Sequence, residues 1–206
     1  MPTRLISKSD SLEEIVGLAW RLLAGGAARA GSPLHTAVLG TRDAAAPCAI
    51  RTVVLRRVVP KRRLLLCHTD RRSPKIDQIT NSLALDWLFY DPAHKLQLRL
   101  SGPGRVLESN DPLTEQQWRH SRTGSRRCYL APLAPGTVSN SPESGFPSGF
   151  RTRKPDRGQS EAGRSNFAVV AGEVTFLDVL QLGARGHLRA QFSWSGESSE
   201  ATWVAP

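Results

Sequence analysis

The sequence predicts a mainly β (α+β) fold, an antiparallel barrel with helices at its periphery. The chain has 206 residues, which suits one domain over residues 1–206. From residue 35 onwards, short segments rich in β-forming residues follow one another and are separated by turn residues. Only two or three segments show helical spacing, so we expect helices that decorate a barrel rather than helices that alternate with parallel strands.

The first expected element is an amphipathic helix over about 11–24. Ser11 and Glu14 stand in the spacing of a capping box, in which each side chain satisfies a backbone N–H of the other. Apolar residues then recur at helical spacing until Gly25–Gly26, which is expected to end the helix.

Eight segments have the alternation or the β-branched content of strands. They are residues 35–41, 49–58, 62–69, 83–91, 95–107, 166–182, 186–194 and 200–206. Pro60 lies between the second and third of these and predicts a hairpin there.

Two further helices and one long loop complete the expected organisation. Ser73 as N-cap and Pro74 at the first helical position mark a helix start. Residues 112–122 have the composition of another helix. Residues 131–165 are rich in Pro, Gly, Ser and Arg and lack periodicity, so we expect a lid, an arm or a disordered loop.

Charge and cysteine content restrict the class of partner. A formal net charge of +10 favours anionic partners, namely nucleic acid, a membrane surface or phosphorylated small molecules. The three cysteines are odd in number and form no C-x-x-C pair, so neither a disulfide framework nor a metal site is indicated, and a reduced cytoplasmic compartment is expected. The sequence shows no signal peptide and no apolar run of membrane-spanning length.

Two segments have the chemistry of a phosphate site. Arg51 and Arg56 stand at the two ends of one apolar strand. Ser73–Lys75 opens a helix, whose free N–H groups suit a phosphate dianion. The alternative interpretations are that the arginines prevent strand aggregation and that Ser73 is a simple cap.

Two other segments place polar side chains on one face of a strand. Gln97 and Arg99 alternate with leucines, and an amide can recognise the edge of a heteroaromatic ring. Arg185, His187 and Arg189 alternate and therefore share a face. The alternatives are ordinary solvent-facing positions and an exposed hairpin turn.

The order of these motifs resembles the pyridoxamine 5′-phosphate oxidase-related, FMN-binding split-barrel family. The resemblance runs from about residue 35 to the C-terminus, and no single motif is specific. The motifs in order are RTVVLR (51–56), CHTDRRSPK (67–75), LFYD (88–91), QLRLSG (97–102), WRHSR (118–122) and RGHLR (185–189).

The resemblance implies a split β-barrel, FMN as cofactor, and a homodimer with FMN at the subunit interface. The residues that it places at FMN are Arg51, Thr52, Val53, Val54, Leu55, Arg56, His68, Thr69, Ser73, Lys75, Gln97 and Arg189. The residues that it places at a small-molecule substrate are Arg56, Trp118, Arg122, Arg185 and His187. His187 is the candidate catalytic residue, and an ordinary surface role is its alternative.

Departures from the family pattern indicate a branch other than the vitamin-B6 enzyme itself. Pro74 stands where the family has the arginine of an Arg-Lys pair, and Arg71 or Arg72 are the candidates to replace it. Arg56 stands in place of a lysine and Trp118 in place of a tyrosine. The family's mid-chain Gln-Ser pair has no counterpart in residues 128–137.

Strict alternation puts Arg51 and Arg56 on opposite faces of an ideal strand. Both can reach one cofactor only if a bulge intervenes or if one acts from the end of the strand. We therefore predict an irregularity within residues 51–57.

The favoured function is an FMN-dependent oxidoreductase in which a small substrate, with or without a phosphate group, passes a hydride to flavin N5. One alternative keeps the fold as a non-catalytic binder of flavin, deazaflavin or haem. Another is a nucleic-acid-binding module, based on the basic runs 56–63, 119–127 and 151–157. The latter is less favoured because no series of base-stacking aromatic residues accompanies these runs.

Overall fold

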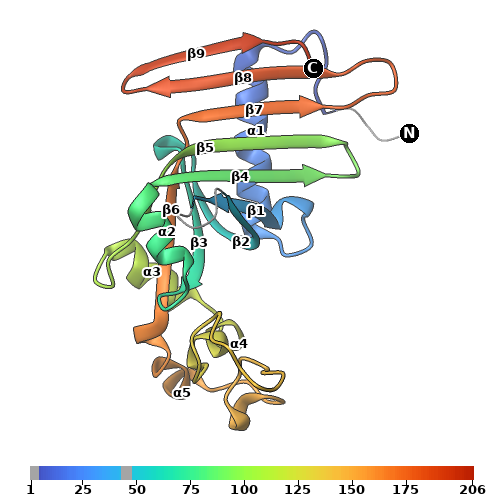
Figure 1. Ribbon diagram of the computed structural model, residues 1–206. Coiled ribbons are helices and arrows are strands. Elements are labelled where there is room, and N and C mark those ends of the chain that lie inside the picture. The colour runs from blue at the N-terminus through green and yellow to red at the C-terminus, as the bar shows by residue number, and fades with distance from the viewer. Residues whose placement is uncertain (1–4, 43–47) are drawn as a thin grey trace.

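A computed structural model describes residues 5–42 and 48–206 of the chain (Figure 1). Six strands close into an antiparallel barrel in the order β4–β1–β2–β3–β6–β5, because β4 also pairs with β5. β7, β8 and β9 extend the sheet from β5 beyond the barrel (Figure 1). The strands are β1 (Thr36–Thr41), β2 (Ala49–Val59), β3 (Leu64–Asp70), β4 (Ala84–Asp91), β5 (Leu96–Val106), β6 (Phe167–Glu173), β7 (Phe176–Gln181), β8 (Leu188–Ser195) and β9 (Ser198–Trp203). The predicted split-barrel fold class is confirmed.

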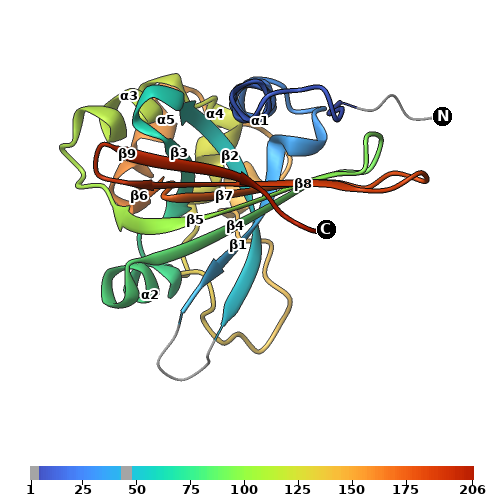
Figure 2. The ribbon, with the colours of Figure 1, turned by 90° about the horizontal axis from the view of Figure 1, so that it is seen from above.

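Helices lie around the sheet rather than between its strands. They are α1 (Leu12–Ala28), α2 (Lys75–Ser82), α3 (Pro112–His120), α4 (Thr123–Arg126) and α5 (Arg157–Glu161). Viewed from above, α1 runs along one side of the sheet and α2 lies on the other side (Figure 2). Within the described ranges, no helix combines the length and the apolar character that crossing a bilayer requires.

Helix α1 begins as the sequence predicts and ends later. Ser11 and Glu14 form both hydrogen bonds of the capping box, at 3.2 and 2.7 Å. The predicted end near residue 24 is wrong, because Gly25 and Gly26 lie inside the helix. A Cβ on Gly26 would lie 2.5 Å from the carbonyl oxygen of Leu34. The glycine therefore allows a close approach of two chain segments and does not terminate the helix.

Two apolar clusters hold the elements together. The larger one fills the barrel and joins it to α1 through buried residues such as Leu23, Leu55 and Leu98. The smaller one lies outside the barrel, beneath α3, where Trp118 and Phe167 pack with their ring centroids 5.0 Å apart. Burial of this second cluster fixes α3 beside β3 and β6.

The segment predicted as one strand over 166–182 is two strands, β6 and β7. β6 belongs to the barrel and β7 to the extension, and Val174 and Thr175 separate them. Val174 donates its N–H to the carbonyl of Arg63 at 2.8 Å, and Thr175 donates to that of Ser101 at 3.0 Å. The chain changes its pairing partner at Val174 and Thr175, neither of which is a turn residue, so the sequence gives no signal for the break.

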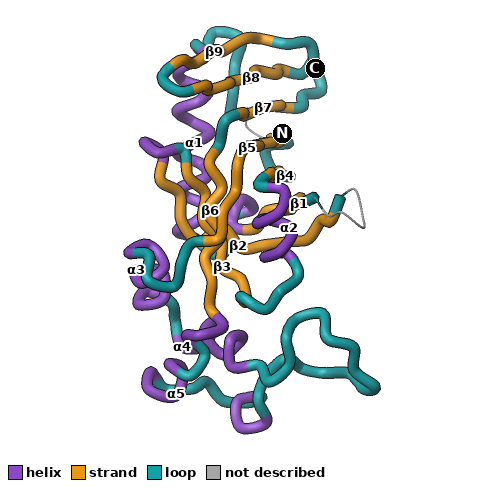
Figure 3. Tube along the Cα trace, turned by 60° about the vertical axis from the view of Figure 1, so that its left-hand side comes forward, coloured by secondary structure: helices purple, strands orange, loops and turns teal. Residues whose placement is uncertain are grey.

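The predicted loop 131–165 is an arm that includes α5 and hangs below the barrel (Figure 3). Arg126 is fully buried at its root. Its guanidinium donates to Glu161 Oε1 at 2.5 Å, to Ser160 Oγ at 3.2 Å and to the carbonyl of Trp118 at 2.6 Å. One buried cation thus ties α5 to α3, which explains how a sequence without periodicity holds a fixed shape.

Replacing Arg126 with methionine should release the arm. The Arg126→Met variant loses the three hydrogen bonds, and we expect the free energy of unfolding to fall by about 2 kcal/mol. Limited proteolysis should cut within residues 131–165 faster than in the wild type. Arg119→Met, which removes an exposed arginine of α3, is the control; equal cleavage of both variants would contradict this role.

Candidate functional site

β2 and β3 stop pairing N-terminal to Leu55, next to a bulge at Arg56, and this separation creates the site. β2 pairs with β3 over Leu55–Val59, and the register shifts between Leu55 and Arg57. Arg56 is therefore the extra residue of a bulge, and the irregularity predicted within residues 51–57 is confirmed. Residues 51–54 pair with β1 on one edge. Among the described residues, no strand pairs with their other edge.

A cavity of 310 Å³ opens between this free edge and the end of β3. Its walls combine backbone edge, cationic side chains and one aromatic ring. The residues that line it are Arg51, Thr52, Val53, Val54, Arg56, His68, Thr69, Asp70, Lys75, Cys128, Tyr129 and Pro135. We call it the first cavity. It contains every residue that the sequence placed at a cofactor between Arg51 and Lys75, except Leu55, which is buried in the core, and Ser73.

Of the three cations that line the first cavity, which are Arg51, Arg56 and Lys75, Arg51 and Lys75 donate to neutral oxygens. Lys75 Nζ donates to Thr69 Oγ1 at 2.9 Å and to Ser73 Oγ at 2.7 Å. Arg51 donates to Thr41 Oγ1 at 2.5 Å. Burial and then the charge of Arg51 lower the pKa of Lys75. Neither cation forms an ion pair within the described part of the chain, so their positive charge is available to a bound anion.

The arginines expected to replace the missing family cation do not line the first cavity. Arg72 forms an ion pair with Asp70 at 2.7 Å and donates to the carbonyl of Ala131 at 3.0 Å. Arg71 donates instead to the carbonyl of Leu107 at 3.4 Å. Neither guanidinium is free for the phosphate site in this conformation of the chain, because each is held by another partner.

The start of α2 also differs in detail from the prediction. The helix begins at Lys75, and Pro74 rather than Ser73 occupies its N-cap position. The hydroxyl of Ser73 accepts a hydrogen bond from Lys75 Nζ and does not cap the helix. Ser73 thus acts on the cavity indirectly, by holding the ammonium group of Lys75 in place.

A second cavity, of 450 Å³, shares Arg56 and His68 with the first. It lies between α1, α3 and the bulge of β2. The residues that line it are Ala27, Ala28, Ala30, His35, Arg56, His68, Gln117, His120, Ser121, Arg122 and Ser125. Of the residues that the sequence placed at a substrate, Arg56 and Arg122 are therefore together in this wall.

Trp118, a further predicted substrate residue, lies beneath this wall. Its side chain is only 3% exposed, and its Nε1 donates to Glu161 Oε2 at 2.8 Å. The guanidinium of Arg126 covers the ring at 4.0 Å from its centroid. In this conformation the indole supports α3 and the arm and presents no hydrogen-bonding group to a substrate.

Two histidines in the second cavity were not predicted from the sequence. His35 Nδ1 lies 2.8 Å from the carbonyl oxygen of Gly26, and His120 Nδ1 lies 2.7 Å from that of Gln116. A carbonyl oxygen can only accept, so each Nδ1 carries the proton and each Nε2 is left as a proton acceptor. His120 stands inside the WRHSR motif and could have been noticed there. No motif in the sequence marks His35 as a site residue.

His68 forms the wall between the two cavities. Its Nε2 lies 3.0 Å from Gln117 Oε1, and its ring meets Phe167 edge-on at 4.8 Å. Burial lowers its pKa to about 4, although the hydrogen bond with Gln117 opposes this shift. His68 is therefore neutral at pH 7 and donates its Nε2–H to the amide oxygen.

Gln97 and Arg189, the remaining predicted cofactor residues, lie on another face. Gln97 of β5 is in register with Leu180 of β7, which is in register with Arg189 of β8. Arg189 donates to both carboxylate oxygens of Asp178, at 3.1 and 2.7 Å. Burial opposes ionisation of Asp178, but hydrogen bonds from Arg189 and Gln191 outweigh it and lower its pKa.

A third cavity, of 570 Å³, lies on the same face and shares no lining residue with the first. Gln97 and Arg99 line it beside apolar side chains that include Ile50 and Leu88. The predicted cofactor residues of one chain therefore fall into two separate groups, one at the free edge of β2 and one on this outer face.

Arg185 and His187 lie at the exposed turn between β7 and β8. His187 Nδ1 accepts a hydrogen bond from the N–H of Gly183 at 3.1 Å. Gly186 between them has φ of 109°, a conformation that favours glycine. Within the described chain, neither residue lines the first or the second cavity.

Comparisons with known proteins agree with this architecture. Residues 19–108 match the family model for pyridoxamine 5′-phosphate oxidase, FMN-binding domain. A pyridoxamine 5′-phosphate oxidase-related, FMN-binding protein from Nostoc punctiforme PCC 73102 aligns with a TM-score of 0.68 at 19% identity, over 98% of this chain and 99% of that chain. PhzG from Burkholderia lata 383, in complex with tetrahydrophenazine-1-carboxylic acid, aligns with a TM-score of 0.71 at 16% identity, over 100% of both chains. A comparison with curated proteins finds no match.

The family resemblance predicted from the sequence is thereby confirmed. The matched residues 19–108 carry strands β1–β5, helix α2 and the three cations of the first cavity, Arg51, Arg56 and Lys75. The two solved structures are less than 20% identical to this chain, so they support the fold alone.

The half-buried His68 makes stability depend on pH. The pKa of His68 is about 4 in the folded chain, against an ordinary value of about 6.5. Between these values the unfolded chain binds more protons, so the free energy of unfolding should fall as the pH falls from 6.5 to 4, by up to about 3 kcal/mol. Denaturant unfolding at a series of pH values measures this slope. His68→Leu should be less steep than the wild type over this range, and parallel slopes would contradict the assignment.

Proposed function

We propose that the protein is an FMN-dependent oxidoreductase whose first cavity holds the cofactor. The observation that carries the proposal is the cavity at the free edge of β2, where Arg51 and Lys75 stand without an acidic partner. Arg51 and Lys75 would hold the phosphate, and the free backbone edge would offer hydrogen-bonding groups to the rest of the cofactor. The family match over residues 19–108 supports FMN as that cofactor.

The donor set fits this group. Two partly buried cations whose hydrogen bonds go to neutral oxygens require a compensating anion, and a phosphate dianion supplies it. The volume of 310 Å³ is at the lower end of ligand-binding pockets. One chain therefore provides part of a flavin site, and a second chain would provide the remainder.

We further infer that two chains associate through the outer face that carries Gln97. Apolar side chains are exposed beside the third cavity: Ile50 is 69% exposed, Tyr90 is 45% exposed, and Val38 and Leu88 are each 37% exposed. A contiguous apolar patch of this kind marks an interface. In the homodimer that the family resemblance implies, Gln97 and Arg189 of each chain would complete the first cavity of the other.

The second cavity is the candidate substrate site. Arg56 and Arg122 would attract an anionic group such as a phosphate or carboxylate. His35 and His120 present Nε2 atoms as proton acceptors, so either could take a proton from the substrate as it is oxidised. When bound, FMN would supply the acceptor, N5, for the hydride. The neutral side chain of His68 lies between the two cavities and lines both.

A non-catalytic cofactor binder is the second candidate, and the burial of Trp118 favours it. The family position that would contact a substrate phosphate is here occupied by an indole with its N–H on Glu161. Oxygen consumption should be measured with pyridoxamine phosphate and with a reduced phenazine carboxylate, the second chosen because of the PhzG likeness. A protein that binds FMN and turns over neither compound would support this second candidate.

Loss of the Lys75 charge should weaken FMN binding. A charge-assisted hydrogen bond contributes about 2 kcal/mol, so Lys75→Met should raise the dissociation constant roughly thirtyfold. The measurement is quenching of flavin fluorescence during titration. Lys61→Met removes the same charge outside the first cavity and should leave the affinity unchanged. No binding by the wild-type protein at tens of micromolar FMN would refute the cofactor assignment.

The proposed interface can be tested separately. A charge at its apolar centre, as in Ile50→Asp, should convert the dimer to a monomer and weaken FMN binding, because an unpaired charge in an interface is costly to desolvate. Light scattering after gel filtration measures the mass. Val138→Asp, at a 91% exposed position of the arm, is the control. A wild-type protein that is monomeric while it binds FMN would exclude the shared site.

A further inference from the structure

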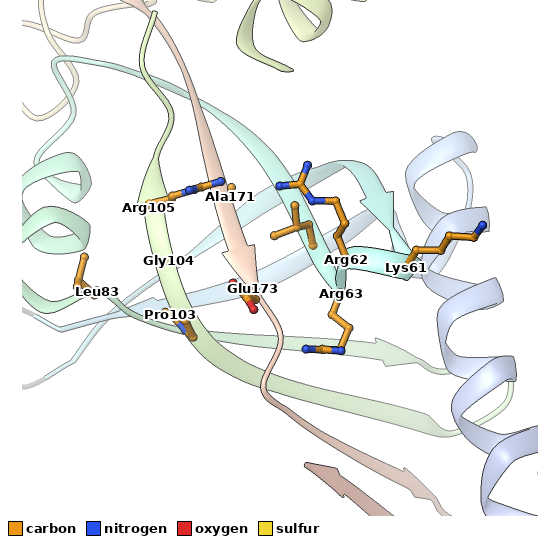
Figure 4. Close-up of a pocket in the computed structure, with 10 residues that line it drawn as sticks. Lys61, Arg62, Arg63, Leu83, Pro103, Gly104, Arg105, Ala171 and Glu173 are labelled. Atoms are coloured by element: carbon orange, nitrogen blue, oxygen red, sulfur yellow. The ribbon is translucent and has the colours of Figure 1, made fainter. Parts of the chain in front are cut away.

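We propose that the chain carries an additional anion-binding site, which takes a small molecule with a phosphate ester group. The site is a cavity of 590 Å³ on the outside of the barrel, beside the turn between β2 and β3 (Figure 4). The residues that line it are Lys61, Arg62, Arg63, Leu64, Leu83, Pro103, Gly104, Arg105, Ala171 and Glu173. We call it the hairpin cavity. It shares no lining residue with the first or the second cavity, and the proposal does not depend on flavin binding.

Positive charge exceeds negative charge in this cavity. Lys61, Arg62, Arg63 and Arg105 are among its lining residues, which include a single carboxylate, Glu173. None of the ion pairs in the described part of the chain includes any of these five residues. The chain therefore leaves the excess charge of the hairpin cavity uncompensated, whereas it pairs the arginines beside Asp70 and Asp178.

Two of these cations converge because of the strand register. Arg105 of β5 is in register with Ala171 of β6, which in turn is paired with Leu66 of β3. Arg62 belongs to the short 3₁₀ turn Pro60–Arg62 just before β3. Arg62 and Arg105 extend toward each other from the two sides of β6, across the small side chain of Ala171 (Figure 4). Two guanidinium groups around one space form a receptor for a dianion, because each presents paired N–H donors.

Arg63 and Leu83 of the cavity wall each end the helical segment that precedes them. Arg63 has φ of 48° and Leu83 has φ of 55°, and both are left-handed C-caps. The N–H of Arg63 donates to the carbonyl of Pro60, and that of Leu83 donates to the carbonyl of Ile79. Arg63 Nε is buried without a hydrogen-bond partner, and the Leu83 side chain is 54% exposed.

The shape of the cavity favours a small ligand with an apolar body. Leu83 and Pro103 form an apolar wall on the side away from Arg62 (Figure 4). A volume of 590 Å³ lies in the range of small-molecule pockets. A phosphate ester would place its dianion between Arg62 and Arg105 and its organic part against this wall.

A nucleic acid is a less suitable occupant, because several arginines of the other basic runs are engaged within the chain. Arg126 is fully buried, and Arg127 donates to the carbonyl of Phe150 at 3.0 Å. Arg157 donates to the carbonyl of Arg119 at 3.2 Å. These side chains do not extend the hairpin cavity into a continuous cationic track of the kind that follows a phosphate backbone.

The test is calorimetric titration with phenyl phosphate of the protein saturated with FMN, so that the first cavity is filled. The double variant Arg62→Gln/Arg105→Gln should bind about tenfold more weakly or worse, because it loses both charge-assisted contacts. Lys61→Gln is the matched control: it removes one charge from the same turn, but its side chain points away from Arg105 (Figure 4). Its affinity should change less than about twofold, by loss of screened long-range attraction alone.

Three outcomes would overturn the proposal. Equal losses per charge removed, in the double variant and in Lys61→Gln, would show attraction to net charge without a site. Binding that Lys75→Met abolishes would place phenyl phosphate in the first cavity, and this variant also serves as the background if FMN does not bind. Binding of a DNA oligonucleotide with no binding of phenyl phosphate at millimolar concentration would replace the small ligand with a nucleic acid. Circular dichroism of each variant verifies the fold.

Discussion

The organisation of the site depends on the point where β2 stops pairing with β3. From Val59 back to Leu55 the two strands share a ladder, in which Arg56 is one extra residue that shifts the register. N-terminal to this ladder, residues 51–54 keep one paired edge and expose the other to the first cavity. Backbone N–H and C=O groups that leave water require partners. A barrel opened in this way is therefore completed by water or by a ligand with a polar edge, and the cations at both ends of the opening select an anionic ligand.

The ion pairs also leave the cations of the first cavity available to an anion. Asp70 and Asp178 are both buried, and each is paired with an arginine from nearby in the fold, Arg72 and Arg189. An unpaired buried carboxylate would be costly, so these arginines have a structural task. Lys75 faces the first cavity and has hydroxyl groups as hydrogen-bond partners. Hydroxyl groups orient a cation without neutralising it, which preserves its field for an anion.

The sequence predicted those features that depend on local pattern. Alternation and turn residues predicted most strands, the capping box predicted the start of α1, and the parity of Arg51 and Arg56 predicted the bulge, because a strand has a side-chain period of two. Features that depend on tertiary partners were missed. Nothing local distinguishes Arg189, which pairs with Asp178 of the neighbouring strand, from an arginine that binds a phosphate. The break in 166–182 has no turn residue, because its N–H groups pair with Arg63 and Ser101 from other strands. His35 lines a cavity only because Gly26 lets its segment approach α1.

The two basic cavities lie toward opposite ends of β3 and differ in how strongly water screens their charges. Leu64, at the beginning of the strand, lines the hairpin cavity, and His68, Thr69 and Asp70, at its end, line the first cavity. Burial lowers the pKa of Lys75, so the charge in the first cavity acts through a medium less polar than water. Arg62 and Arg105 are exposed, and salt screens exposed charges over about 8–10 Å. An anion in the first cavity would thus be held by a few short, weakly screened contacts, whereas one in the hairpin cavity would exchange with bulk ions. This difference suits the first cavity to a permanently held group and the hairpin cavity to a ligand whose occupancy follows its concentration.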